Sequence, residues 1–131
     1  IFAAALVYAQ FFAFYERQRG VAALRIGEEM VPVADYDGID ATSSPLKLRA
    51  CFRIDPAAVA ALAPADKPTP LTPPFWFRCF DAGGLAADLA SCAARAYAIG
   101  AGQPVGFDAM IAVYPDGRGY LWRQLAPEFM D

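Results

Sequence analysis

Residues 107–125 have the sequence FDAMIAVYPDGRGYLWRQL, in which two apolar and aromatic runs flank Pro115-Asp116-Gly117-Arg118. The runs, 107–114 and 119–125, have the composition typical of β-strands. Asp-Gly between two such runs is a strong local signal for a hairpin, because glycine adopts the positive φ that the turn requires. This stretch therefore predicts a C-terminal β-hairpin.

Segments before the hairpin predict further strands. Residues 46–54 alternate apolar and polar side chains and predict a strand, and residues 21–33 predict one or two short strands. Pro32 limits the second of these to a sheet edge, because proline has no backbone N–H to donate. Residues 36–40 contain Asp37-Gly38 and predict a turn.

One helix and one long loop complete the predicted body. Asp81 is expected to cap a helix over residues 84–94, with Leu85 on its inward side. Residues 55–74 hold six of the chain's 11 prolines and predict an extended, proline-rich excursion. Strands, one helix and a closing hairpin predict an α+β fold with a small, mainly antiparallel sheet.

The N-terminal run predicts a transmembrane helix. Residues 1–15 contain no charged side chain, but as a helix they span roughly 22 Å, short of the roughly 30 Å hydrocarbon core. The chain opens at Ile1 without a Met, so we expect missing residues that complete the span. We place an N-terminally incomplete anchor at residues 1–19 and an exoplasmic α+β domain at residues 20–131. A secretory signal peptide and a buried core helix are the alternatives.

Aromatic side chains gather at the end of this run, as they do where a membrane helix meets water. The predicted membrane-interface residues are Phe11, Phe12, Phe14 and Tyr15. Arg17 and Arg19 follow and give a weak orientation signal. Together with the cysteine usage, the run predicts a single-pass protein of the bacterial inner membrane with its body in the periplasm.

Two of the three cysteines are predicted to form a disulfide. Cys51 and Cys79 each lie beside a phenylalanine, and a bridge between them encloses the proline-rich excursion. Two buried thiols in a reducing compartment are the alternative. Cys92, among alanines, is expected to fill a small space in the core.

Composition excludes several classes of function. The formal net charge of −3 argues against binding nucleic acid, which requires a basic surface. The chain has no histidine, the commonest general base and zinc ligand. The cluster Asp35, Asp37 and Asp40 lacks the ligand set of a calcium loop and predicts solvated carboxylates. We expect no catalytic residue, metal or cofactor.

Three consecutive aromatic residues, Phe75, Trp76 and Phe77, form the candidate contact site. Successive side chains of an extended segment point to opposite sides, so the three cannot all face one core. At least one is expected to be exposed or packed on something else, and contact with a protein partner or with the lipid bilayer is one interpretation. Ordinary core packing beneath the excursion is the alternative.

Three stretches of the chain resemble a family of small bacterial single-pass membrane-anchored proteins of unknown function. They are residues 14–16, residues 43–52 with Cys51-Phe52, and Trp76-Phe77-Arg78-Cys79-Phe80-Asp81; the closing residues 116–122 also fit. The resemblance implies an N-terminal anchor and an α+β body. It implies no activity, cofactor or catalytic residue.

These observations predict a non-catalytic accessory subunit of a larger integral membrane protein complex, of respiratory or photosynthetic electron-transport type. The absence of histidine and the apolar body, whose aromatic triplet offers a docking surface, support this expectation. An assembly factor or chaperone for such a complex is the first alternative. A small enzyme or ligand-binding domain using carboxylates such as Asp81 or Asp108 is the second.

Overall fold

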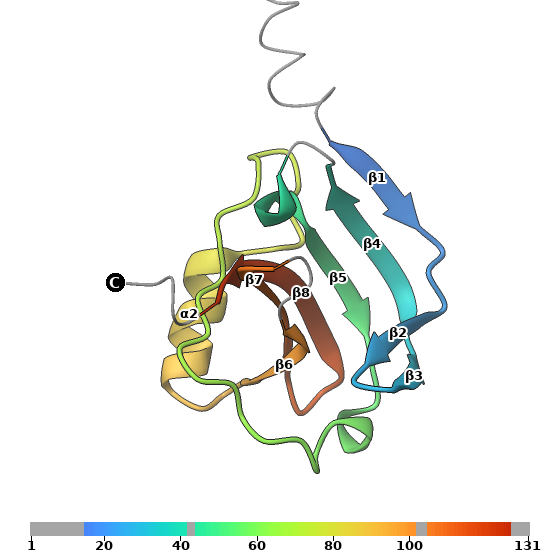
Figure 1. The fold of residues 1–131 in the computed structure, drawn as a ribbon, viewed down its shortest axis with the longest axis vertical. Coiled ribbons are helices and arrows are strands. Elements are labelled where there is room, and N and C mark those ends of the chain that lie inside the picture. Colours follow the sequence, from blue (N-terminus) through green and yellow to red (C-terminus); the bar gives the residue numbers. More distant parts are fainter. Residues whose placement is uncertain (1–14, 42–43, 102–104, 127–131) are drawn as a thin grey trace, which may run out of the picture.

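The computed structural model describes residues 15–41, 44–101 and 105–126. Its eight strands are β1 (Glu16–Arg19), β2 (Ala23–Ile26), β3 (Glu29–Pro32), β4 (Ala34–Asp40), β5 (Arg49–Arg53), β6 (Arg95–Ala101), β7 (Phe107–Val113) and β8 (Arg118–Leu125). The α-helix is α2 (Ala82–Ala90), and single 3₁₀ turns occur at Pro45–Lys47 and Pro56–Ala58. Six strands form one antiparallel sheet in the order β1-β4-β5-β8-β7-β6, and β2 pairs with β3 in a separate hairpin (Figure 1).

The predicted C-terminal hairpin is confirmed as β7 and β8. At its turn the Tyr114 N–H donates to the Arg118 carbonyl at 2.9 Å, and the Gly117 N–H donates to the Tyr114 carbonyl at 3.0 Å. Gly117 has φ of 94°, which side chains disfavour. A Cβ there would also lie 3.1 Å from the Ile54 carbonyl oxygen, so the turn packs closely on the end of β5.

The central sheet buries both of its faces. On β8 the side chains alternate, so that Leu121 and Trp122 belong to different cores. We call the side of Leu121 the hairpin face, because Ile26 and Val31 of the β2–β3 hairpin pack there. We call the side of Trp122 the helix face, because α2 and the residues before it cover it. Figure 1 shows α2 and the hairpin at opposite sides of the molecule.

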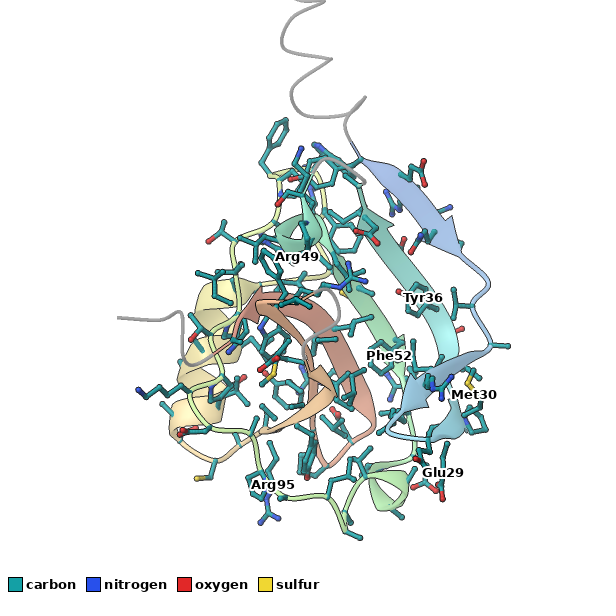
Figure 2. All side chains as sticks on the ribbon, in the orientation of Figure 1. Glu29, Met30, Tyr36, Arg49, Phe52 and Arg95 are labelled. Carbon is teal, nitrogen blue, oxygen red and sulfur yellow. A yellow bond between two sulfur atoms is a disulfide. The ribbon has the colours of Figure 1, made fainter. Side chains whose placement is uncertain are left out.

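On the hairpin face, Phe52 packs directly over β8. Its partner in the β5–β8 register is Gly119, where a Cβ would lie only 2.3 Å from the Phe52 ring. Tyr36 stacks on the same ring with centroids 6.2 Å apart (Figure 2). Glycine at position 119 therefore makes room for an aromatic pair that joins β4, β5 and β8.

The predicted α+β fold with an N-terminal transmembrane helix is wrong. The structure is mostly antiparallel sheet, with eight strands and one α-helix in the described residues. Within residues 15–41, 44–101 and 105–126, no helix is long and apolar enough to cross a membrane. Residues 16–19, placed at the end of the predicted helix, form β1, because Glu16–Arg19 pair with β4. Residues 1–14 lie outside the described residues.

The turn predicted at residues 36–40 is also wrong, because this segment is strand β4, paired with β1 on one side and β5 on the other. A Cβ at Gly38 would lie 2.8 Å from the Tyr36 ring and 3.1 Å from the Ala50 methyl group. Gly38 thus serves a close approach of side chains over the sheet rather than a turn.

The helix prediction is confirmed with shifted bounds. Helix α2 covers Ala82–Ala90, and Asp81 is its N-cap, accepting a hydrogen bond from the Gly84 N–H at 3.1 Å. Leu85 is buried against the helix face of the sheet. The predicted strands within residues 21–33 and 46–54 are confirmed as β2, β3 and β5.

Candidate functional site

The predicted disulfide is confirmed and defines one end of the candidate site. Cys51 on β5 is bonded to Cys79, 28 residues later, with their Cα atoms 6.3 Å apart. The bridge ties residues 74–80, which we call the aromatic loop, to the middle of the central sheet. Cys92 is exposed with φ of 65°, so its predicted place in the core is wrong.

A buried arginine holds the chain just before the aromatic loop. The Arg49 guanidinium donates to the carbonyls of Leu71 at 2.8 Å and Thr72 at 3.4 Å, and also to those of Leu46 and Leu48. Burial lowers the pKa of Arg49, and the nearby Tyr15 opposes that shift. Since its acceptors are backbone oxygens of two separate segments, Arg49 fixes the path of the chain up to residue 72.

Phe77 anchors the loop from within. Its ring is only 2% exposed and belongs to the core of the helix face. The Arg17 guanidinium of β1 lies 5.5 Å from the centroid of this ring, a cation–π contact. Phe77 is therefore a core residue, as the alternative of core packing expected for the triplet.

Trp76 of the aromatic loop contacts Tyr15, the residue that precedes β1. Trp76 is half-buried, and its ring meets Tyr15 edge-on with centroids 5.8 Å apart. The Lys47 ammonium lies 5.2 Å from the centroid of the Tyr15 ring. Tyr15 was predicted at a membrane interface, and the structure places it in this aromatic cluster. The other predicted interface residues, Phe11, Phe12 and Phe14, lie outside the described residues.

Phe75 projects from the loop. It is 72% exposed, although the next two residues are packed and the bridge follows at Cys79. Beside it is a shallow hollow of about 320 Å³, whose lining includes Pro73, Pro74, Phe75, Arg78 and Phe80. Phe75 is thus the exposed member of the triplet, and its predicted contact with a partner stays a prediction. The site is thus an exposed phenyl ring on a loop whose backbone is held at both ends.

A second buried polar residue, Gln124 of β8, holds the proline-rich segment in place. Its side-chain oxygen accepts from the Thr69 N–H at 2.7 Å and from the Trp122 indole at 2.9 Å. Its amide nitrogen donates to the Lys67 carbonyl at 3.0 Å. Thr69 and Lys67 lie 55 and 57 positions before Gln124 in the chain. These hydrogen bonds therefore attach the proline-rich segment to strand β8 of the sheet.

We expect Gln124→Leu to lower the free energy of unfolding by about 2 kcal/mol, because the Thr69 N–H and the Lys67 carbonyl would lose their partners. Urea unfolding measures the loss, and faster hydrogen exchange at Thr69 would locate it. Gln18→Leu, on the edge strand β1, is the matched control and should change stability by less than about 0.5 kcal/mol. Equal effects of the two substitutions would contradict this role for Gln124.

An ion pair joins the two strands beside the loop. Arg17 donates to the two carboxylate oxygens of Asp37 at 2.6 and 2.7 Å, and Arg19 lies 3.5 Å from the same group. The hydrogen bond from Arg17 is the main cause of a lowered pKa of Asp37. The pair links β1 to β4 on the face where Phe77 lies.

This pair predicts a small pH dependence. Because the pKa of Asp37 is lowered on folding, its contribution is present above the unfolded pKa of about 3.9 and is lost as pH falls through the folded pKa. The ion pair is partly exposed to solvent, so we expect Asp37→Asn to cost about 0.5 kcal/mol at pH 7 and almost nothing well below pH 3. Urea unfolding at both pH values measures it, with exposed Asp66→Asn as control. A larger loss of stability from Asp37→Asn in acid than at pH 7 would contradict the predicted direction of this pH dependence.

The carboxylates considered from the sequence lie on different elements of the fold. Asp81 is the cap of α2, and Asp108 lies on β7. Asp40 lies 3.6 Å from Arg123, apart from the Asp37 pair. In the part of the chain that the structure describes, no group of three or more acidic or cysteine side chains could hold a metal ion.

Sequence patterns did not identify Arg49 or Gln124 as supports of the site. Arg49 occupies a polar position of an alternating strand, which ordinarily predicts exposure. Arg49 and Gln124 each bond to backbone groups of the proline-rich segment, and backbone groups give no side-chain signal in the sequence. The hydrogen-bonding partners are far apart in the sequence, so local sequence patterns cannot predict these contacts.

A family model described as a family of unknown function, DUF6446, matches residues 21–128. No curated protein and no solved structure matches the sequence. The expected resemblance to an uncharacterised family is thereby confirmed, whereas membrane anchoring of that family stays a prediction.

Proposed function

We propose that this chain, which belongs to the DUF6446 family of unknown function, is a non-catalytic accessory subunit that docks on a larger membrane protein complex. The aromatic loop makes the contact, with Phe75 as the inserted residue and Trp76 at its edge. The role of Phe77 is to hold the loop from the core.

One observation supports this proposal above the others: Phe75 is 72% exposed on a restrained loop. An exposed phenyl ring leaves apolar surface in water, which is unfavourable unless a partner covers it. Restraint by Arg49 and by the Cys51–Cys79 bridge means that little backbone freedom is lost on binding. Rigid aromatic residues of this kind are typical centres of protein interfaces.

The surroundings of Phe75 indicate the chemistry of the partner surface. Arg78 is exposed beside it and lines the same hollow. A partner with an apolar pocket for the ring and carboxylates at the pocket's rim would complement both groups.

The disulfide supports an exoplasmic location for the domain. Disulfides persist in oxidising compartments such as the periplasm and are rare where glutathione keeps thiols reduced. Alkylation of free thiols in freshly lysed cells, followed by mass mapping, should find Cys51 and Cys79 bonded and Cys92 labelled. Labelling of all three would count against this location.

The test compares wild-type chain, Phe75→Ser and Met30→Ser, each tagged and purified in mild detergent from its natural source. Met30 is the matched control, because it is 63% exposed on the β2–β3 hairpin, away from the aromatic loop. Native gels and mass spectrometry should show wild-type and Met30→Ser co-migrating in fixed stoichiometry with a mature complex, and Phe75→Ser released from it. Thermal unfolding within about 2 °C of wild-type would show that Phe75→Ser is folded.

Two outcomes would overturn the proposal. A monodisperse monomer without a partner would exclude an accessory subunit, and undiminished retention of Phe75→Ser would exclude this contact site. Substoichiometric association with immature intermediates alone would instead identify an assembly factor.

A further inference from the structure

The disulfide that ties the aromatic loop to the sheet is open to approach from outside. Cys79 is exposed and Cys51 is half-buried. Both half-cystines line one shallow hollow of about 290 Å³. Bridges inside a core are out of reach of other thiols, whereas exposed ones are the bridges that exchange readily. The location of this bridge therefore permits chemistry that a buried disulfide would not.

The hollow opens on the helix face, beside the Cys79 end of the aromatic loop. Cys51 of β5 pairs with Asp37 of β4 and with Tyr120 of β8, and cross-strand partners lie on the same side of a sheet. Cys51 and Tyr120 both pack against the core of the helix face. The three strands thus form the floor of the hollow, and Cys79 forms part of its wall.

The lining is balanced in charge. Arg53 and Arg118 contribute two positive charges, and Asp35 and Asp37 contribute two negative ones. Asp37 and Arg118 also have ion-pair partners of their own. The hollow therefore has no net charge that would favour a charged co-reactant, and we expect an uncharged thiol to react there.

The aromatic loop keeps other anchors when the bridge opens. Phe77 and Phe80 lie on either side of Cys79, and each ring is only 2% exposed. Arg49 holds the preceding backbone through the Leu71 carbonyl. These contacts do not involve the disulfide. The chain can therefore stay folded after reduction, with its two thiols near enough to bond again.

We propose that the Cys51–Cys79 disulfide is a site of reversible thiol–disulfide exchange, at which a dithiol attacks Cys79. Cys79 is the sulfur attacked because it is the exposed member of the pair. Exchange switches the aromatic loop between a form bonded to β5 and a looser form. Any effect of this switch on partner binding rests on the proposed docking function, whereas the exchange itself does not.

The reaction has two steps. A thiolate of the dithiol attacks Cys79 Sγ, a mixed disulfide forms, the bridge breaks, and Cys51 leaves as a thiolate. The second thiol of the dithiol then attacks the donor sulfur of the mixed disulfide and releases the Cys79 thiolate. The dithiol loses two electrons and two protons and becomes a disulfide. Cys51 and Cys79 each end as a thiol.

The first experiment compares the rate of reduction in folded and unfolded chain. The probe is dithiothreitol, an uncharged dithiol, acting on the full chain with Cys92→Ala so that the third cysteine cannot exchange. Acid quenching, alkylation and mass spectrometry follow the reaction. We expect the folded chain to react within about 10-fold of the rate in urea-unfolded chain. A bridge reachable only by unfolding would react about 10³–10⁸-fold more slowly in the folded chain.

Ile111→Ala tests the same point without urea. Ile111 is completely buried on the hairpin face, on the other side of the sheet from the hollow. Its replacement should raise the unfolding equilibrium constant at least about 30-fold. The rate of reduction should nevertheless stay within about 2-fold of the parent chain, because exchange does not require unfolding. The comparison with urea-unfolded chain does not depend on this variant.

A monothiol locates the sulfur that is attacked. After brief treatment with 2-mercaptoethanol and acid quenching, mass mapping should find the mixed disulfide on Cys79 at least about 5-fold more often than on Cys51. The fully reduced chain should still unfold cooperatively in urea, and oxidised dithiothreitol should restore the Cys51–Cys79 bridge.

Several results would overturn the proposal. Reduction at least 10³-fold slower in folded than in unfolded chain, or a rate that rises with the unfolding constant in Ile111→Ala, would show that the bridge reacts only on unfolding. An adduct mainly on Cys51 would exclude attack at Cys79, and loss of the fold on reduction would exclude reversible exchange. All these measurements use the chain without a partner, so their failure would leave the docking proposal to its own test.

Discussion

Replacing Trp122 by alanine is expected to lower the free energy of unfolding by about 4 kcal/mol. The side chain is completely buried at the centre of the helix face, where it meets Phe80 edge-on with centroids 6.3 Å apart. Its indole N–H donates to Gln124, which in turn holds the proline-rich segment. The substitution therefore removes a large apolar contact and weakens a hydrogen-bond network at once.

Urea unfolding followed by circular dichroism measures this loss against the 5–15 kcal/mol typical of a whole domain. Leu125→Ala on the same strand is the control, since Leu125 is partly exposed, and it should cost less than about 1 kcal/mol. Trp122→Phe keeps a ring but loses the indole donor and should fall between the two. A Trp122→Ala loss no larger than that of Leu125→Ala would contradict the packing described here.

Removing the disulfide is expected to have the next largest effect. For a loop closed over a separation of 28 residues, the chain-entropy model gives a stabilisation of about 3.5 kcal/mol. Cys51→Ala and Cys79→Ala should each lose this amount, because either change opens the same loop. Both should also release Phe75 and thereby weaken docking on the proposed partner.

Cys92→Ala controls for the loss of a thiol, and it should change stability by less than about 0.5 kcal/mol because Cys92 is exposed. Adding a reductant to wild-type chain should reproduce the effect of Cys51→Ala without any substitution. If Cys51→Ala unfolds at the same urea concentration as Cys92→Ala, the bridge does not stabilise the fold.

Short-range sequence patterns were sufficient to predict the elements that depend mainly on neighbouring residues. The β7–β8 turn follows from a glycine at positive φ, and α2 follows from the Asp81 cap. The disulfide prediction rested on two cysteines in similar strand settings, and the closure of that loop proved correct. None of these inferences required knowledge of which strands are neighbours.

The candidate site was identified in part. The aromatic triplet indicated that at least one ring is exposed or packed away from the core, because alternation prevents three successive side chains from facing one core. Which ring is exposed depends on Arg49, Gln124 and the core around Phe77, all brought together from distant positions. Periodicity cannot report such contacts.

The dipeptide Asp-Gly occurs at residues 37–38 and again at residues 116–117, with opposite outcomes. At 116–117 it makes the hairpin turn that the sequence by itself determined, because the two flanking runs pair with each other and glycine takes φ of 94°. At 37–38 it lies within β4, because that segment pairs with β1 and β5 and Gly38 accommodates the Tyr36 ring. A backbone turn is a local choice of dihedral angles, whereas a strand becomes stable through hydrogen bonds to neighbours that only the tertiary structure supplies.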